Sequence, residues 1–352
     1  MRVGVIGCGA IAQRAHLPTF TSLENVELYA VADINKNIAK RVAKKFKVKK
    51  YFKNYKDLLE EPSIDLVSIC TPSQLHAQMI IDSAKAGKHI LVEKPLALSV
   101  KEALSALRAV KENNVKLCVA QNYRYFPAIK DVKKSILEGK LGRIVSILGQ
   151  ANTPIPLKWT ASNWLYHEGG CVDDFAPHLI DGICWLCNSQ VNKVVAFGGD
   201  FIGNMNCINY VQIVMYFDNK TIATANITWL TPYILSMNIN GTAGNINLDL
   251  RFNNFVIYHD FLDPLNEFKN SFKKLFSSIK ASLSGELFIG ALSFYKNLIG
   301  DFINAIENNG KSPISGDEVL QTVVVLEAAK KSLKRNEIII VEELYEDLHK
   351  IS

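Results

Sequence analysis

The sequence predicts an α/β domain built on a parallel sheet, followed by an α+β domain with a large, mostly antiparallel, open-faced sheet. Over residues 1–122, short apolar runs alternate with helical patterns, which is typical of a doubly wound parallel sheet. Over residues 123–352, longer runs follow in which apolar and polar residues alternate, and this favours antiparallel strands with helices on one face. A chain of 352 residues also exceeds the size of one ordinary domain. We therefore expect domains at 1–122 and 123–352.

The first 33 residues indicate a strand, a glycine turn, a helix and a second strand that ends in an acid. The turn Gly7-Cys8-Gly9-Ala10-Ile11-Ala12 fits the pattern G-x-G-x-x-A. In this pattern the first glycine permits the bend, the second leaves room for a pyrophosphate, and the small final residue lets the helix pack on the strand. Asp33 is placed to accept hydrogen bonds from the adenosine ribose and to repel a 2′-phosphate. The unit therefore predicts a Rossmann-type dinucleotide-binding domain that takes NAD rather than NADP.

Three further strands are expected in this domain at 65–71, 89–92 and 116–120, with helices at 75–86 and 99–113. Ligands of such sheets bind beyond the carboxyl ends of the strands. Polar or turn residues occupy five of these ends, namely Gly7, Gly9, Asp33, Thr71, Pro72, Glu93, Lys94, Gln121 and Tyr123.

The second domain carries seven segments with strand patterns, at 143–150, 192–199, 208–217, 220–229, 234–240, 245–250 and 254–258. Residues 217–220 form a plausible hairpin turn between two of them. The open face of a large sheet needs cover, which predicts a homodimer or homotetramer through this sheet. Residues 266–306 show helical spacing of apolar residues with lysines between them. We expect this helix to pack on its own domain, although a basic amphipathic helix can also rest on a membrane or guard a phosphorylated substrate.

The composition argues against several other classes of protein. The net charge is +6, and its densest basic segment, 36–56, reads as a solvated helix face and loop; a phosphate site for NADP there would conflict with Asp33. No nucleic-acid reading motif is evident. The 7 cysteines lie mostly in apolar runs, which suits a reducing, cytoplasmic location. Cys184 and Cys187 lack a second pair, so no metal site is expected. The first residues show no basic-then-apolar pattern and no apolar run of about 18 residues occurs, so we expect neither secretion nor a membrane span.

Six motifs occur in order between residues 7 and 244. They are GCGAIA at 7–12 with His16-Leu17-Pro18, CTPSQLH at 70–76, EKP at 93–95, QNYRYFP at 121–127, GGCVDDFAPHLID at 169–181 and NGTAG at 240–244. In this order they resemble the Gfo/Idh/MocA oxidoreductases, the family of glucose–fructose oxidoreductase and inositol dehydrogenase.

The resemblance assigns most cofactor contacts to the first domain. The residues that would hold the pyrophosphate are Gly7, Gly9, Ala10, Ile11 and Ala12, with Asp33 on the adenosine ribose. Thr71, Pro72 and His76 would lie along the cofactor, Glu93 would contact the nicotinamide ribose, and Gln121 completes the set. The resemblance also implies a cis peptide bond at Lys94-Pro95 and places Lys94 between the nicotinamide and the reacting carbon.

The catalytic assignment also rests on spacing. Gly169-Gly170 give a flexible entry, Asp174 suits an N-cap or first-turn position, and Pro177 is tolerated only in that first turn. Asp174 and His178 are four residues apart and so share a helix face. Oxidation of a secondary alcohol needs a base, and histidine, with a reference pKa of about 6.5, fits. We assign His178 as the base, Asp174 as the group that positions substrate or histidine, and Lys94 as the charge that steadies the alkoxide.

The substrate side is less specified. Glu168 and Asp173 depart from the family's usual glycine and apolar residue, and both belong near the substrate mouth. The candidates to line a sugar or polyol pocket are Tyr123, Arg124, Trp159, Trp164, Tyr166 and His167. Ordinary packing in the core explains the two tryptophans equally well. The sequence thus predicts an NAD-dependent oxidoreductase that acts on a secondary alcohol of a sugar, cyclitol or nucleotide sugar. The alternatives are an NAD-retaining glycosidase or lyase with transient oxidation, and a non-catalytic dinucleotide-binding regulator, which would tend to lose Lys94 or His178.

Overall fold

The computed structural model describes residues 1–154, 169–203, 205–258, 272, 276 and 286–349. Its contacts divide the chain into two compact units. The first unit comprises Met1–Gln121 and Tyr295–Val323, and the second comprises Asn122–Phe294 and Val324–Ser352. The domain limits 1–122 and 123–352 stay a prediction; in the division by contacts, Tyr295–Val323 belong with the first unit.

The first unit is built on a six-stranded sheet with the order β3-β2-β1-β4-β5-β6. Its strands are β1 (Arg2–Ile6), β2 (Glu27–Ala32), β3 (Lys50–Phe52), β4 (Leu66–Ile69), β5 (His89–Val92) and β6 (Leu117–Val119). All neighbouring strands pair in parallel, which confirms the predicted doubly wound sheet. The chain order reverses between β1 and β4, and ligands of open α/β sheets bind at such a point. All four residues of β4 are buried, as expected for a parallel strand covered on both faces.

Helices connect these strands. They are η1 (Ala12–His16), α1 (Leu17–Ser22), α2 (Lys36–Phe46), α3 (Tyr55–Leu59), η2 (Ser73–Leu75), α4 (His76–Lys85) and α5 (Val100–Glu112). The helix after the glycine turn begins at Ala10 and contains a π-helical turn, η1. Such turns insert one extra residue into a helix and are frequent at functional sites. Here the π turn ends at His16, a buried side chain.

The second unit contains an eight-stranded sheet with the order β13-β12-β11-β7-β10-β9-β8-β14. The strands are β7 (Ile144–Pro154), β8 (Val191–Gly199), β9 (Tyr210–Phe217), β10 (Ile222–Thr228), β11 (Leu230–Gly241), β12 (Gly244–Asp249), β13 (Asn254–Tyr258) and β14 (Ile339–Ile340). Within the described part of this sheet, β7 and β10 pair in parallel and the other neighbours are antiparallel. The predicted hairpin is present, because Lys220 N donates to the carbonyl of Phe217 at 2.9 Å between β9 and β10.

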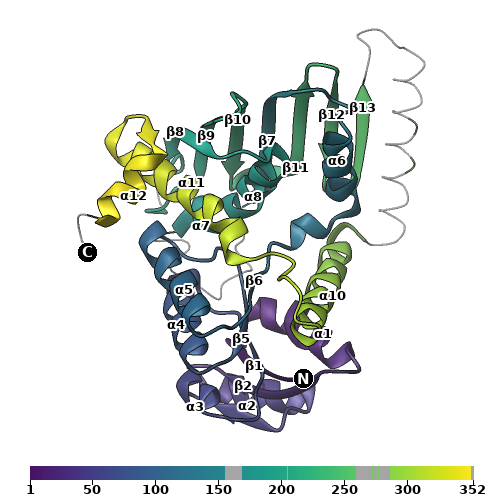
Figure 1. The fold of residues 1–352 in the computed structure, drawn as a ribbon, viewed down its shortest axis with the longest axis vertical. Coiled ribbons are helices and arrows are strands. Elements are labelled where there is room, and N and C mark those ends of the chain that lie inside the picture. The colour runs from purple at the N-terminus through teal and green to yellow at the C-terminus, as the bar shows by residue number, and fades with distance from the viewer. Residues whose placement is uncertain (155–168, 204, 259–271, 273–275, 277–285, 350–352) are drawn as a thin grey trace. The chain divides into compact units, whose positions relative to one another are not determined.

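The two faces of this sheet differ. The helices of the second unit include η3 (Asn122–Tyr125), α6 (Pro127–Leu137), α7 (Gly170–Asp174), α8 (Ala176–Cys187) and α12 (Val341–His349), while α10 (Glu286–Glu307) and α11 (Gly316–Arg335) contribute to both units. α8 lies against one face of the sheet (Figure 1). It approaches so closely that a Cβ added at Gly149 would meet Leu179. On the opposite face Phe197 is 64% exposed and Ile222 48%. The prediction of an open-faced sheet is therefore confirmed.

Three other sequence features can be placed. The helical pattern at 266–306 falls mostly outside the described residues, and α10 is its described part. Cys184 and Cys187 lie on α8, and among the described side chains no cluster of His, Cys, Asp or Glu could hold a metal ion. In the same part of the chain, no helix is long and apolar enough to cross a membrane.

Candidate active site

The glycine turn after β1 has the geometry that a bound pyrophosphate needs. Gly7 has a φ of +90°, and an added Cβ would lie 2.6 Å from the carbonyl oxygen of Cys70, so only glycine fits here. A Cβ added at Gly9 would meet no atom within 4 Å, so the turn is open on that side. The first N–H groups of the following helix lack partners within the helix and favour an anion. The turn therefore fits the phosphates of a dinucleotide.

The other residues predicted for this turn surround the opening. Ala12 is fully buried against the sheet, whereas Ala10 and Ile11 are accessible at the start of the helix. Burial and the nearby carboxylate of Asp33 raise the pKa of Cys8 to about 12. The Cys8 thiol therefore stays neutral and adds no negative charge beside the phosphates.

Asp33 is oriented by backbone hydrogen bonds. Its Oδ2 accepts from the N–H of Cys8 at 2.9 Å, and its Oδ1 accepts from the N–H of Asn35 at 2.8 Å. A carboxylate can accept about four hydrogen bonds, and Asp33 is only half-buried. Capacity therefore remains for the ribose hydroxyls that the sequence assigns to it.

A buried histidine joins the ends of β4 and β5. The ring of His76 faces the carbonyl of Pro95 through Nδ1 at 2.7 Å and the carbonyl of Thr71 through Nε2 at 2.9 Å. Burial lowers the pKa of His76. Thr71 and Pro72 are half-buried and Gln121 is buried. The direct contacts of these residues with a cofactor stay predictions.

Glu93, at the end of β5, is buried in a network that the sequence did not predict. Its Oε1 accepts from Nε2 of His16 at 2.7 Å and from the hydroxyl of Tyr295 at 2.9 Å. Its Oε2 accepts from the backbone N–H of Lys94 at 3.3 Å. On the other side of the histidine ring, Nδ1 lies 2.8 Å from the hydroxyl of Ser68. The only sequence signal for this network was the place of His16 in a motif.

His16 and Glu93 form an ion pair. Burial alone would lower the pKa of His16, but the sulfur of Cys70 and the carboxylate of Glu93 outweigh it and raise this pKa. Burial would also raise the pKa of Glu93, but His16 and Lys94 outweigh it and lower this pKa. The imidazole is therefore protonated and the carboxylate ionised. The peptide bond that follows, Lys94-Pro95, is cis, as the resemblance implied.

In the second unit, Tyr123 lies close to His178, the residue assigned as the base, and to Asp174, the residue assigned to positioning. The ring of Tyr123 stacks on that of His178, with centroids 4.1 Å apart and planes inclined by 14°. The edge of Phe175 also faces the His178 ring, with centroids 6.4 Å apart. Burial, the neighbouring Tyr233 and the charge of Asp174 raise the pKa of Tyr123. Tyr123, Asp174 and His178 therefore share one neighbourhood.

The position predicted for Asp174 within its helix was wrong. The sequence placed it at the N-cap or first turn of a helix that contains His178. In the structure α7 ends at Asp174, and Phe175 is the N-cap of α8. Pro177 lies in the first turn of α8 and, because it lacks an N–H, it cannot continue the hydrogen bonds of α7. The chain therefore forms two short helices where one was expected.

Arg124 is held by a carboxylate of the same unit. Its Nε and Nη2 donate to the two oxygens of Asp181 at 2.8 Å and 2.7 Å, and both side chains are buried. A role in substrate binding stays a prediction for Arg124. Asp173 is also buried and forms an ion pair with Lys330. Trp164, together with the other residues predicted between 155 and 168, lies outside the described residues.

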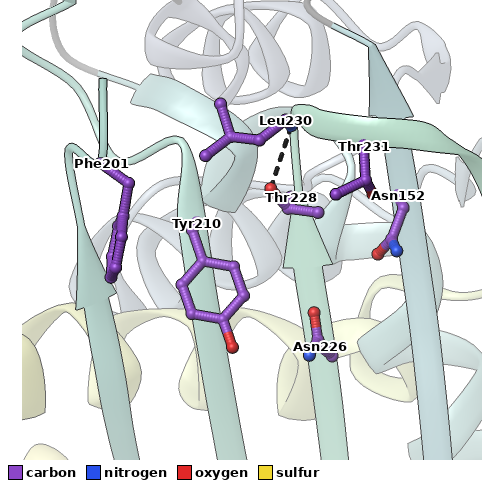
Figure 2. Close-up of a pocket in the computed structure, with 7 residues that line it drawn as sticks. All are labelled: Asn152, Phe201, Tyr210, Asn226, Thr228, Leu230 and Thr231. Carbon is purple, nitrogen blue, oxygen red and sulfur yellow. Dashed lines mark hydrogen bonds between the residues drawn. The ribbon is translucent and has the colours of Figure 1, made fainter.

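A cavity of about 300 Å³ opens on the exposed face of the eight-stranded sheet (Figure 2). It is lined by Asn152, Phe201, Tyr210, Asn226, Thr228, Leu230 and Thr231. Tyr210 and Asn152 both pair with Thr228, so their side chains point to the same face, opposite α8. Among the described residues, none of those predicted for the site lines this cavity.

The predicted residues thus form two groups. In the first unit the structure collects the glycine turn, Asp33, Thr71, Glu93 and Lys94 at the carboxyl ends of parallel strands. In the second unit it collects Tyr123, Asp174 and His178.

Comparisons with known proteins identify the family of both parts of the chain. Residues 1–121 match the family described as "Oxidoreductase family, NAD-binding Rossmann fold", and residues 129–247 match the "GFO/IDH/MocA C-terminal domain". This confirms the predicted family and NAD as the cofactor.

Individual relatives are dehydrogenases by name. The chain is 30% identical to levoglucosan dehydrogenase of Pseudarthrobacter phenanthrenivorans over 70% of this chain and 73% of the relative. It is 24% identical to myo-inositol 2-dehydrogenase of Thermotoga maritima over 98% and 99%. Its fold is similar to that of scyllo-inositol dehydrogenase from Lactobacillus casei, solved with NAD(H) and scyllo-inositol, with a TM-score of 0.78, 20% identity and coverage of 97% and 99%. The chain therefore belongs to the Gfo/Idh/MocA family of oxidoreductases, with an NAD-binding Rossmann fold in its first part.

Proposed function

We propose that this protein is a dehydrogenase that transfers hydride between NAD and a secondary alcohol of a sugar, cyclitol or nucleotide sugar. The observation that carries the proposal is the stacking of His178 on Tyr123 beside Asp174, in a chain whose other unit binds NAD. The names of the relatives support the substrate class, because levoglucosan and inositol are both polyhydroxyl rings.

The side chains divide the chemistry between them. When bound, NAD supplies the acceptor for the hydride. His178 accepts the proton of the substrate hydroxyl, since an imidazole with a pKa near neutrality can take and return a proton. Asp174 positions the substrate or the histidine, and the ammonium of Lys94 stabilises the negative charge that develops on the oxygen. Arg124 and Trp164 complete the proposed substrate-binding set with Tyr123.

The open face of the sheet supports a proposal of self-association. Leu148, Phe197 and Ile222 are exposed apolar residues on this face. The strand register places Ile222 opposite Tyr216 and Phe197 opposite Gln212, so these side chains share the face that α8 does not cover. Monomeric proteins rarely expose large contiguous apolar patches. We infer that a homodimer or homotetramer covers this face.

The seven free thiols favour a reducing compartment, the cytoplasm.

A panel of substrates tests the proposed function. The purified protein is incubated with NAD and with inositols, levoglucosan, hexoses, hexose phosphates or nucleotide sugars, and NADH is followed by its absorbance. We expect net NADH formation with at least one polyhydroxyl ring. Consumption of a glycoside without net NADH would favour transient oxidation, and NAD binding without conversion of any compound would favour the non-catalytic regulator.

A further inference from the structure

Three parts of the chain that are remote in sequence meet at the carboxylate of Glu93. His16 comes from the π-helical turn after the glycine loop, Glu93 from the end of β5, and Tyr295 from α10, 202 residues further along the chain. All three belong to the first unit. The rings of His16 and Tyr295 also touch, with centroids 5.2 Å apart. One oxygen of Glu93 thus has two fixed donors, and the other faces the backbone of Lys94.

Stability alone does not account for this network. His16 is fully buried and Glu93 almost so, and taking two charges out of water costs several kcal/mol per ion, so apolar side chains of similar volume would often be as stabilising. Apolar side chains, however, donate no hydrogen bonds and so cannot hold the carboxylate of Glu93 in one orientation. The residue that follows Glu93 is the lysine assigned to the reacting oxygen, and on the other side of Lys94 the carbonyl of Pro95 is held by His76.

We propose that His16 and Tyr295 are positioning residues that hold Glu93, and through it the backbone of Lys94, in the arrangement required at the nicotinamide end of the cofactor. The inference rests on the proposed function for the role of Lys94. The adenosine end is held by other groups, the glycine turn and Asp33, which none of the network residues touches among the described hydrogen bonds. A defect in the network should therefore weaken binding of the nicotinamide end of NAD and leave binding of the adenosine end unchanged.

The test compares a probe of the whole cofactor with a probe of its adenosine end. Dissociation constants for NADH and for ADP are measured for the wild type, Tyr295→Phe and His16→Gln, along with thermal stability and kcat. The matched control is Tyr55→Phe, which also removes a tyrosine hydroxyl bonded to a carboxylate, that of Asp82 at 2.6 Å, elsewhere in the same unit.

Positioning predicts a selective loss. Tyr295→Phe and His16→Gln should each weaken NADH binding and lower kcat about tenfold, the usual effect of losing one hydrogen bond to a charged group, while ADP binding stays unchanged. Combining Tyr295→Phe with Glu93→Gln should add little to either variant alone, because all of them act through one carboxylate. Tyr55→Phe should match the wild type.

Two results would overturn the inference. One is unchanged NADH binding and kcat in Tyr295→Phe; the other is a parallel weakening of NADH and ADP binding together with lower thermal stability, which would indicate a purely structural role. If His16→Gln does not fold, Tyr295→Phe decides the matter, since it removes a single oxygen atom. Should no substrate be converted by the wild type, the proposed function fails, but the ratio of the NADH and ADP constants still decides whether the network shapes the nicotinamide end.

Discussion

At the scale of single residues, we expect Asp33 to be the side chain that selects NAD over NADP. Asp33→Ala removes the acceptor assigned to the ribose hydroxyls and a charge that repels a 2′-phosphate. We expect NAD affinity to fall about tenfold and the gap between NAD and NADP to narrow, as measured by titration calorimetry. Asp65→Ala is the control, because Asp65 Oδ2 likewise accepts from a backbone N–H, that of Arg2 at 2.7 Å. A wild type that prefers NADP would contradict the role given to Asp33.

His16 should also make stability depend on pH. The pKa of His16 is raised from 6.5 to about 10 in the folded chain, and that of Glu93 is lowered from 4.5. The ion pair therefore stabilises fully between pH 4.5 and 6.5, and this contribution is lost as pH rises towards 10. The charged or titratable groups around the ring are Glu93, Cys70 and Tyr295. The difference in unfolding midpoint between the wild type and His16→Gln should therefore shrink with rising pH. A difference that stays constant from pH 6.5 to 10 would refute the ion pair.

At the level of elements, the two glycines of the turn should have different roles: Gly7 in stability and Gly9 in NAD binding. Gly7→Ala places a Cβ 2.6 Å from a carbonyl oxygen at a φ of +90°, and strain of this kind costs about 1–3 kcal/mol or more. Gly9→Ala meets no protein atom. We expect Gly7→Ala to lower the melting temperature by several degrees, and Gly9→Ala to melt like the wild type but bind NAD weakly. Equal NAD affinity in Gly9→Ala and the wild type would mean that the phosphates do not lie there.

The regular elements were largely predictable, because periodicity is a local property. The five apolar strands of the first unit and the seven of the second were each found near their predicted positions. β3 and β14 were not predicted: β3 is a three-residue strand that begins with Lys50, and β14 has two residues, too short to show a period. The break between Asp174 and Ala176 was missed. Pro177 fits the first turn of one longer helix as well as the first turn of α8, so the sequence did not show that α7 ends at Asp174.

For the whole molecule, the exposed face of the eight-stranded sheet leads to a prediction about the oligomeric state. Phe197→Glu puts a charge into the proposed interface, where an unpaired buried charge is costly. We expect size-exclusion chromatography with light scattering to give a dimer or tetramer for the wild type and a shift towards monomer for Phe197→Glu. Leu137→Glu changes a side chain of similar exposure, 69%, at the end of α6 and should leave the mass unchanged. A monomeric wild type would contradict the proposal.

The long-range part of the site could not be read from the sequence. The strand-end residues were predictable, since parallel strands bring their carboxyl ends to one edge. The partners of Glu93 were not, because His16 and Tyr295 are 77 and 202 residues away from it and no local spacing connects them. The inclusion of Tyr295–Val323 in the first unit has the same origin, a tertiary contact between distant segments.

One measurement tests the proposed proton-transfer role of His178 most directly. With the best substrate of the panel at saturating NAD, kcat/KM is compared between the wild type and His178→Gln, and NAD binding is measured in parallel. We predict a loss of at least about 100-fold in kcat/KM, the usual contribution of a general base, with NAD affinity unchanged. A variant that turns over at the wild-type rate would show that His178 is not the base.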